Sequence, residues 1–283
     1  MRKFRFIHLL FLVLMGAGLQ LSGKVHAGYV DYTLPTGQVR VHHSTATPAN
    51  CNAILLGVGT AMSISSYDKL SDELIKHGYV AVIMDHAPGS MTKTDPAKFA
   101  ALANDIKVNL SSWLSGSACS SITHWVMGGH SAGGQAAQNA IANSLTQADA
   151  IFSIDPYNVS NAGFVNVPAL YWGFDVTTCF VDKNSAAKAA YLRSQNHRAF
   201  FRVAKKYSWG PCGYSPVYFH CSFCDDHCPA CTNCMNTPQH FFVDVADSVN
   251  RFILAAFTGT WSKAALTIPA TTPLTLFVDG ELP

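Results

Sequence analysis

The sequence predicts an α/β domain, in which a mainly parallel sheet is covered by helices on both faces. Short apolar runs of strand length alternate with longer segments whose apolar residues recur at helical spacing. This alternation is typical of parallel sheets built from strand–helix–strand units. The sequence also shows no internal repeat and no low-complexity linker, so its length favours one domain with a sizeable core.

The predicted strands are short apolar runs bounded by turn residues. In chain order, strands are expected over 30–34, 39–43, 53–58, 80–84, 122–127, 150–154, 167–173 and 199–203. The first two form an opening hairpin, because Pro35-Thr36-Gly37 between them is a turn sequence. The later runs are apolar almost throughout, which is typical of strands buried on both faces of a parallel sheet.

The predicted helices alternate with these strands. In chain order, helices are expected over 67–75, 99–113, 134–142, 186–194 and 242–256. Asp95-Pro96 lies near the start of the second helix, and the apolar residues of the last helix fall on one face. The tail after Thr260 ends in a short apolar run, to which the sequence assigns no role.

Residues 1–27 are predicted to be a secretory signal peptide. Basic residues precede an apolar run over 7–21, and Val25-His26-Ala27 offers a small residue for cleavage. The apolar run is too short and wrongly flanked for a membrane-spanning helix, so no stable span is expected. A single mature domain is therefore expected over 28–283, in a secreted or periplasmic protein.

The charge of the chain argues against nucleic acid as a partner. Only 13% of the residues are charged, the net charge is +2, and no cluster of Lys and Arg stands out. This composition suits an exported enzyme that meets apolar or uncharged substrates. Separately, we expect the protein to be a monomer.

Residues 129–133, Gly129-His130-Ser131-Ala132-Gly133, form the pattern G-x-S-x-G. An apolar run precedes this pattern, and small, helix-forming residues follow it. A serine between a strand and a helix in this pattern sits on a tight bend that exposes its hydroxyl. We therefore expect Ser131 to be a nucleophile.

A serine nucleophile needs a histidine base and an acid that orients the base. The acid candidates are Asp155 and Asp175, because each follows the end of a predicted strand. His220, which closes an apolar stretch, is the first choice of base, and His240 is the second. The nearby His130 and the cysteine-flanked His227 are expected to serve other purposes.

These residues together resemble α/β-hydrolases of the chlorophyllase and polyester-hydrolase-like group, which is related to dienelactone hydrolases. The resemblance rests on residues 129–134, on Ile154-Asp155-Pro156, on Val167-Pro168-Ala169-Leu170 and on His220-Cys221-Ser222-Phe223. It implies an α/β-hydrolase fold. Chlorophyllase-like members and platelet-activating-factor acetylhydrolases carry the acid at the position of Asp155, whereas cutinase-like enzymes carry it at that of Asp175. We rank Asp155 first.

The resemblance also implies an oxyanion hole and a disulfide. The oxyanion would be bound by the backbone amides of Ala132 and Thr60, although the loop at Val58-Gly59-Thr60 lacks the usual His-Gly or Gly-aromatic pair. In this fold the strands that follow Cys51 and Cys119 are parallel neighbours. Residues at the same end of such strands approach within disulfide distance, so a Cys51–Cys119 bridge is expected.

All nine cysteines follow the predicted signal peptide, which favours disulfides in an exported protein. Most belong to a cysteine-rich insertion over about 207–235, which contains Cys212, Cys221, Cys224, Cys228, Cys231 and Cys234. We interpret this insertion as a disulfide-stapled loop without a metal. A structural zinc site is the alternative, because C-x-x-C spacing suits zinc. The pairing within the insertion and the fate of Cys179 stay open.

The expected function is a secreted serine hydrolase that cleaves carboxylic esters through an acyl-enzyme and uses no cofactor. Its substrate would be a small-molecule, lipid or polymer ester. One alternative is a non-catalytic binding protein on the same fold, since fold does not determine function. A metal-binding module centred on the cysteine-rich insertion is the other.

Overall fold

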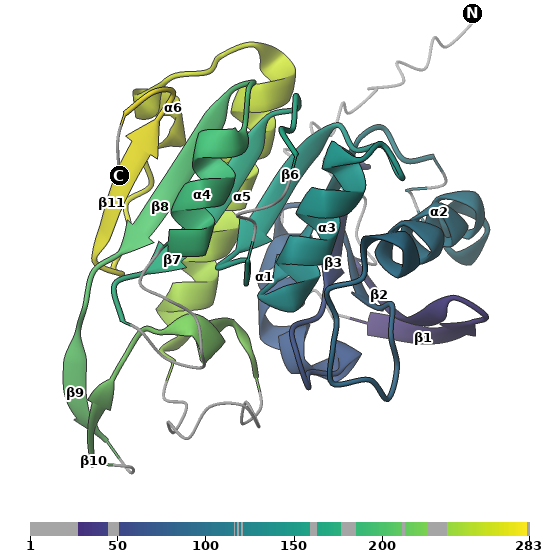
Figure 1. Cartoon of the computed structure of the whole chain (residues 1–283), viewed down its shortest axis with the longest axis horizontal. Coiled ribbons are helices and arrows are strands. Elements are labelled where there is room, and N and C mark those ends of the chain that lie inside the picture. Colours follow the sequence, from purple (N-terminus) through teal and green to yellow (C-terminus); the bar gives the residue numbers. More distant parts are fainter. Residues whose placement is uncertain are drawn as a thin grey trace, which may run out of the picture.

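A mostly parallel sheet forms the centre of the protein in the computed structural model (Figure 1). The structure describes residues 28–281, except 45–50, 116, 118, 120, 159–162, 177–184, 211–212 and 226–236. The strands of the sheet are β1 (Gly28–Leu34), β2 (Gly37–His43), β3 (Ala53–Gly57), β4 (Val80–Asp85), β5 (Trp125–His130), β6 (Ala150–Ile154), β7 (Ala169–Phe174), β8 (Arg198–Val203) and β11 (Leu274–Val278).

The strands lie in the order β1-β2-β4-β3-β5-β6-β7-β8-β11. The six strands from β4 to β8 in this order are parallel, whereas β1, β2 and β11 extend the two sides with antiparallel pairs. Strands β3, β4, β6 and β7 are buried along their whole length. Their continuous apolar sequences therefore match a sheet that is covered on both faces.

Helices cover both faces of the sheet. On one face lie α2 (Pro96–Trp113), α3 (Ala132–Ala142) and α4 (Ser185–Arg193), which stand in front of the strands in Figure 1. The other face packs against η1 (Ile64–Tyr67), α1 (Asp68–Lys76), α5 (Gln239–Thr258) and α6 (Lys263–Leu266). The predicted α/β architecture with helices on both faces is thus confirmed. Within the described part of the chain, no helix has the length and apolarity needed to cross a bilayer.

Two strands of the central sheet differ most from the sequence prediction. Strand β5 begins at Trp125 and continues to His130, whereas a strand over 122–127 was expected. The strand therefore includes Gly128 and Gly129. Glycine is required at position 128, because a side chain there would overlap the carbonyl of Phe152 on the neighbouring strand. The tail without an assigned role supplies β11, which pairs with β8 and makes β8 an interior strand.

The cysteine-rich insertion is described only in part. It contributes a hairpin of β9 (Tyr207–Gly210) and β10 (Gly213–Pro216), which projects beyond the carboxyl end of β8 (Figure 1). The short helix η2 (His220–Phe223) follows this hairpin. The predicted signal peptide lies outside the described residues, and so do His227, Cys179, Cys212, Cys228, Cys231 and Cys234.

The predicted disulfide between Cys51 and Cys119 is present, with 5.2 Å between the two Cα atoms. Cys51 precedes β3 and Cys119 precedes β5, and these strands are parallel neighbours. The bridge therefore joins the two chain segments that lead into β3 and β5, at the amino ends of these parallel strands.

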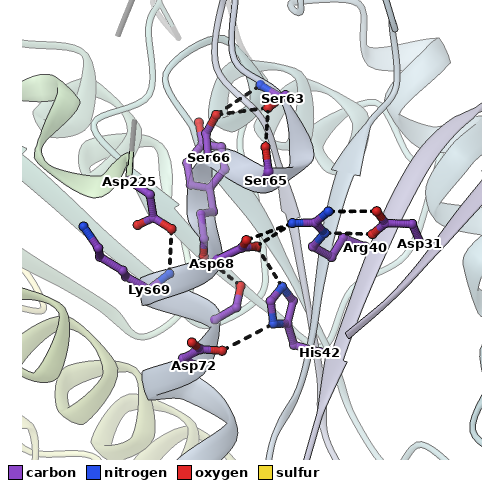
Figure 2. Close-up of polar contacts among 12 residues, drawn as sticks. Asp31, Arg40, His42, Ser63, Ser65, Ser66, Asp68, Lys69, Asp72 and Asp225 are labelled. Carbon is purple, nitrogen blue, oxygen red and sulfur yellow. Dashed lines mark hydrogen bonds and ion pairs between the residues drawn. The ribbon is translucent and has the colours of Figure 1, made fainter. Parts of the chain in front are cut away.

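A charged cluster fastens the first hairpin to helix α1 (Figure 2). The guanidinium of Arg40 on β2 pairs with Asp31 on β1 at 2.7 Å and with Asp68 on α1 at 2.8 Å. The buried His42 ring lies between Asp68, at 3.2 Å, and Asp72, at 3.5 Å. These contacts hold α1 and the preceding η1 in place against β2. They are strong because Arg40 is mostly buried, where solvent and salt screen charges less.

Candidate active site

Neighbouring strands β3 and β5 mark the point where the chain connections diverge. From β3 the chain leads to β4 on one side, and from β5 it leads to β6 on the other side. Ligands of open α/β sheets bind in the crevice that such divergence leaves outside the carboxyl ends of the strands. The loop after β3 and the G-x-S-x-G sequence, which spans the end of β5 and the start of α3, both lie at this crevice.

Ser131 forms the sharp bend between β5 and α3. Its backbone has φ 52° and ψ −121°, a region that a non-glycine residue rarely adopts. The Ser131 amide donates to the carbonyl of Ile154 at 3.1 Å, and the Ser131 carbonyl accepts from Gln135 and Tyr157. Strain of this kind costs about 1–3 kcal/mol and persists where the surroundings hold it, as these three bonds do here.

The glycines around Ser131 allow the loop after β3 to approach it. A side chain at Gly129 would come within 2.6 Å of the Gly57 carbonyl, and one at Gly133 would overlap the same carbonyl. A Cβ at Gly59 would lie 3.2 Å from the Ser131 Cβ. The G-x-S-x-G spacing is therefore required by close packing of β5 and α3 against β3.

His220 and Asp155 form a buried pair beside this bend. The His220 Nδ1 lies 2.7 Å from the Asp155 Oδ2, and each side chain is only 4% exposed. Burial raises the pKa of the Asp155 carboxyl, and its bond to His220 acts in the opposite direction. When Asp155 is ionised it accepts the Nδ1 proton, which leaves Nε2 of His220 able to act as a base.

Asp155 resembles Ser131 in its backbone. It follows β6 with φ 42°, and its amide donates to the carbonyl of Trp172 on β7 at 2.7 Å. This bond across to the next strand fixes the bend that turns the Asp155 side chain toward His220.

The structure does not bring the second-ranked residues to this pair. Asp175 binds the guanidinium of Arg202 on β8 through both of its oxygens, at 2.7 and 3.0 Å. His240, at the start of α5, contacts the hydroxyl of Tyr218 at 2.7 Å. Of the two acid candidates, Asp155 is the one in contact with His220.

His130 lies behind the bend, in a chain of hydrogen bonds. Its Nδ1 is 2.9 Å from the hydroxyl of Tyr67, which also accepts the amide proton of Gly59 at 2.9 Å. Its Nε2 is 2.7 Å from the carbonyl of His220. Burial lowers the pKa of His130 well below its usual range, and the nearby His220 lowers it further. His130 is therefore neutral near pH 7.

Two backbone amides remain available at the crevice. The amide of Ala132 lies in the first turn of α3, where helix amides lack partners within the helix. Thr60 lies in a turn closed by a bond from the Met62 amide to the Gly59 carbonyl at 3.1 Å. Neither the Ala132 nor the Thr60 amide has a hydrogen-bond partner in the described chain, whereas the Gly59 amide is bound by Tyr67.

The Ser131 hydroxyl makes no hydrogen bond to His220 among the described atoms. The rings of His130 and His220 are 4.5 Å apart between centroids, so His220 nevertheless lies next to the residue that precedes Ser131. Bonds between a nucleophile and its base are often long without substrate and tighten when substrate binds.

The described part of the cysteine-rich insertion contains one disulfide-bonded cysteine, Cys221. Cys224 is buried, with its sulfur 3.8 Å from the His130 Nδ1. In the described residues, no three His, Cys, Asp or Glu side chains are grouped as metal ligands.

Two residues at or near this site, Tyr67 and Asp225, were not predicted from the sequence. Tyr67 was assigned to an apolar helix face, and Asp225, in the insertion, was given no role. Asp225 accepts the amide proton of Lys69 at 2.8 Å (Figure 2), and its own amide donates to the Ser66 carbonyl at 2.7 Å. Nothing local to either residue could reveal these contacts, because each contact joins segments far apart in the sequence.

Neither models of protein families nor curated proteins gave a match when compared with this sequence. The function is therefore inferred from the geometry of the site.

Proposed function

We propose that this protein is a secreted serine esterase with an α/β-hydrolase fold. The observation that carries the proposal is the strained bend at Ser131, next to the buried pair of His220 and Asp155. The chain order Ser, Asp, His supports it, because α/β-hydrolases have their triads in this order. The site between β3 and β5 supports it further, because both oxyanion-hole candidates flank the same crevice.

In the first half of the reaction, Ser131 Oγ attacks the carbonyl carbon of the ester while His220 Nε2 takes the hydroxyl proton. Asp155 stabilises the resulting imidazolium through its bond to Nδ1. The carbonyl oxygen becomes an anion, which accepts hydrogen bonds from the Ala132 and Thr60 amides. One such donor contributes about 2.7–4 kcal/mol. The C–O bond then breaks, and His220 returns the proton to the alcohol as it leaves.

In the second half, His220 takes a proton from water, and the water oxygen attacks the acyl group on Ser131. The bond between the acyl carbon and Oγ breaks, and His220 returns its proton to Oγ. The products are an acid and an alcohol, and no cofactor takes part. The substrate class is a carboxylic ester, whether small molecule, lipid or polymer.

Replacing Ser131 by alanine tests the proposal. We expect Ser131→Ala to lower turnover of nitrophenyl esters by at least about 10³-fold, because the covalent step is lost. Turnover should be measured over a series of acyl lengths, with circular dichroism as a check on folding. A fluorophosphonate probe should label the wild-type protein at Ser131, as read by peptide mapping.

Ser144→Ala is the matched control. Ser144 is an exposed serine at the other end of α3, and it shares the positive φ, at 57°. Activity should be unchanged in this variant. Full activity of Ser131→Ala, or a wild-type protein that hydrolyses no ester and takes up no probe, would contradict the proposal.

A further inference from the structure

We propose that Tyr67 and His130 are positioning residues, which together hold the loop after β3 and the base His220 in fixed places on either side of Ser131. The proposal rests on the proposed esterase function. Both side chains are almost fully buried, at 1% and 2% exposed, so neither is expected to touch substrate. Their effect on the reaction must therefore pass through the groups that they hold.

The direction of each hydrogen bond follows from the two ends of the series, because the Gly59 amide can only donate and the His220 carbonyl can only accept. The Gly59 amide has only a proton to offer, so the Tyr67 oxygen accepts it. The Tyr67 hydroxyl then has its own proton available for the His130 Nδ1, 2.9 Å away. The His220 carbonyl next to Nε2 can only accept, so the ring proton of neutral His130 lies on Nε2 and Nδ1 is the acceptor nitrogen.

The second nitrogen of His130 completes the chain. Its Nε2 proton is donated to the carbonyl of His220 at 2.7 Å. A single neutral tautomer of His130 thus connects the oxyanion loop, through Tyr67, with the backbone of the base. An imidazolium could not accept the proton from Tyr67, so burial, which keeps His130 neutral, preserves the connection.

A second connection joins the same two segments. Tyr67 lies between Ser66 and Lys69, whose backbones bind the amide and the carboxylate of Asp225, as described above. The segment 220–225 is therefore tied to the segment 64–69 at two places, of which Figure 2 shows the contact between Asp225 and Lys69. Because α1 has no side-chain cap of its own at Tyr67, Asp225 also supplies an acceptor for one of its unpaired amides.

The consequences of losing these hydrogen bonds follow from the burial of the groups that make them. Removing the Tyr67 hydroxyl leaves the Gly59 amide and the His130 Nδ1 without this partner in a dry environment, which favours a shift of the loop. A shift of the loop moves the Thr60 amide away from the developing oxyanion. Because this interaction strengthens in the transition state, kcat should fall while KM changes little.

The test compares Tyr67→Phe and His130→Asn with the wild-type protein. Phenylalanine keeps the ring and removes one oxygen, and asparagine is too short to reach the His220 carbonyl. We expect kcat for a nitrophenyl ester to fall about 10- to 100-fold in each variant, with KM within about twofold. The double variant should be no slower than the slower single variant, because both changes break one chain.

Tyr79→Phe is the matched control. Tyr79 is equally buried, and its hydroxyl donates to Asn250 at 2.8 Å at the amino end of the sheet, away from Ser131. This variant loses one hydroxyl bond of similar kind, and its kcat should stay within about twofold of wild type.

A proton NMR measurement separates this proposal from the esterase proposal. The Nδ1 proton of His220, held by Asp155, should give a low-field resonance whether or not the protein hydrolyses any ester tested. We expect the resonance to shift or broaden in Tyr67→Phe and His130→Asn and to be unchanged in Tyr79→Phe. If both Tyr67→Phe and His130→Asn kept the wild-type resonance and the wild-type kcat, the positioning role would be overturned. A wild-type protein that hydrolyses no ester would overturn only the esterase proposal.

Discussion

At the scale of single residues, backbone strain is concentrated at the candidate site. The described chain has five non-glycine residues with positive φ, and three of them, Ala61, Ser131 and Asp155, lie in the loops at the crevice. Strain of this kind clusters at functional sites, where the surrounding structure can hold it. Its position at the proposed nucleophile, the proposed acid and the proposed oxyanion loop favours a site built for catalysis over an incidental turn.

The choice between the two acids can be tested by one-atom substitutions. Asp155→Asn should lower turnover about 10⁴-fold, because an amide cannot stabilise the protonated form of His220. The matched change Asp175→Asn removes a carboxylate that binds Arg202 and should alter turnover less than about tenfold. Ester hydrolysis kinetics check both values, and a larger loss in Asp175→Asn would transfer the acid role to Asp175.

At the scale of elements, the packing of β3 against β5 determines the site. The glycines of both strands allow a close approach at their carboxyl ends, where Ser131 meets the loop at Gly59. At the amino ends the Cys51–Cys119 disulfide joins the segments that lead into the same two strands. The disulfide and the site therefore lie at opposite ends of one strand pair.

This separation predicts that the disulfide stabilises the fold without taking part in the proposed reaction. Removing it in Cys51→Ala/Cys119→Ala should lower the free energy of unfolding by about 2–4 kcal/mol, because the bridge closes a long loop. The melting temperature should fall by about 5–15 °C. Ester turnover at room temperature should stay near the wild-type value. Thermal unfolding and kinetics of the same sample check this, and an unchanged melting temperature would contradict it.

At the scale of the whole molecule, the core contains histidines that are held neutral. Burial lowers the pKa of His42, His86 and His130 below the usual value of 6.5. In the unfolded chain these rings regain ordinary pKa values. As the pH falls through about 6.5, the unfolded state binds protons that the folded state excludes, so the free energy of unfolding decreases. The raised pKa of Asp155 opposes this loss, because the folded state then binds a proton more readily.

The expected acid sensitivity can be measured by denaturant unfolding between about pH 7 and pH 5. Each neutral buried histidine contributes a slope of up to about 1.4 kcal/mol per pH unit in this range. His130→Asn removes one such group, so its stability should fall less steeply with acid than that of wild type. Equal slopes for the two proteins would contradict a neutral His130 in the folded state.

The fold could be predicted in its main elements because each element has a local pattern. Continuous apolar runs indicated β3, β4, β6 and β7, and the G-x-S-x-G sequence indicated the bend at Ser131. Strand β11 was not predicted, because its short apolar run pairs with β8, a strand about 70 residues earlier, as an antiparallel edge. The extension of β5 through Gly128 was also missed. Glycine is needed there because β6 lies too close for a side chain, and the local sequence does not show that neighbour.

The sequence by itself determined the α/β class, the bend at Ser131 and a short choice of partners for it. Only the tertiary structure decided that Asp155 contacts His220, since both aspartates follow a strand and the difference is Arg202 opposite Asp175. It also decided that Tyr67 and His130 join the two halves of the site. Local patterns reflect dihedral preferences and burial of nearby residues, whereas these contacts join residues 63 to 90 positions apart. Contacts at that separation depend on the order of the strands in the sheet.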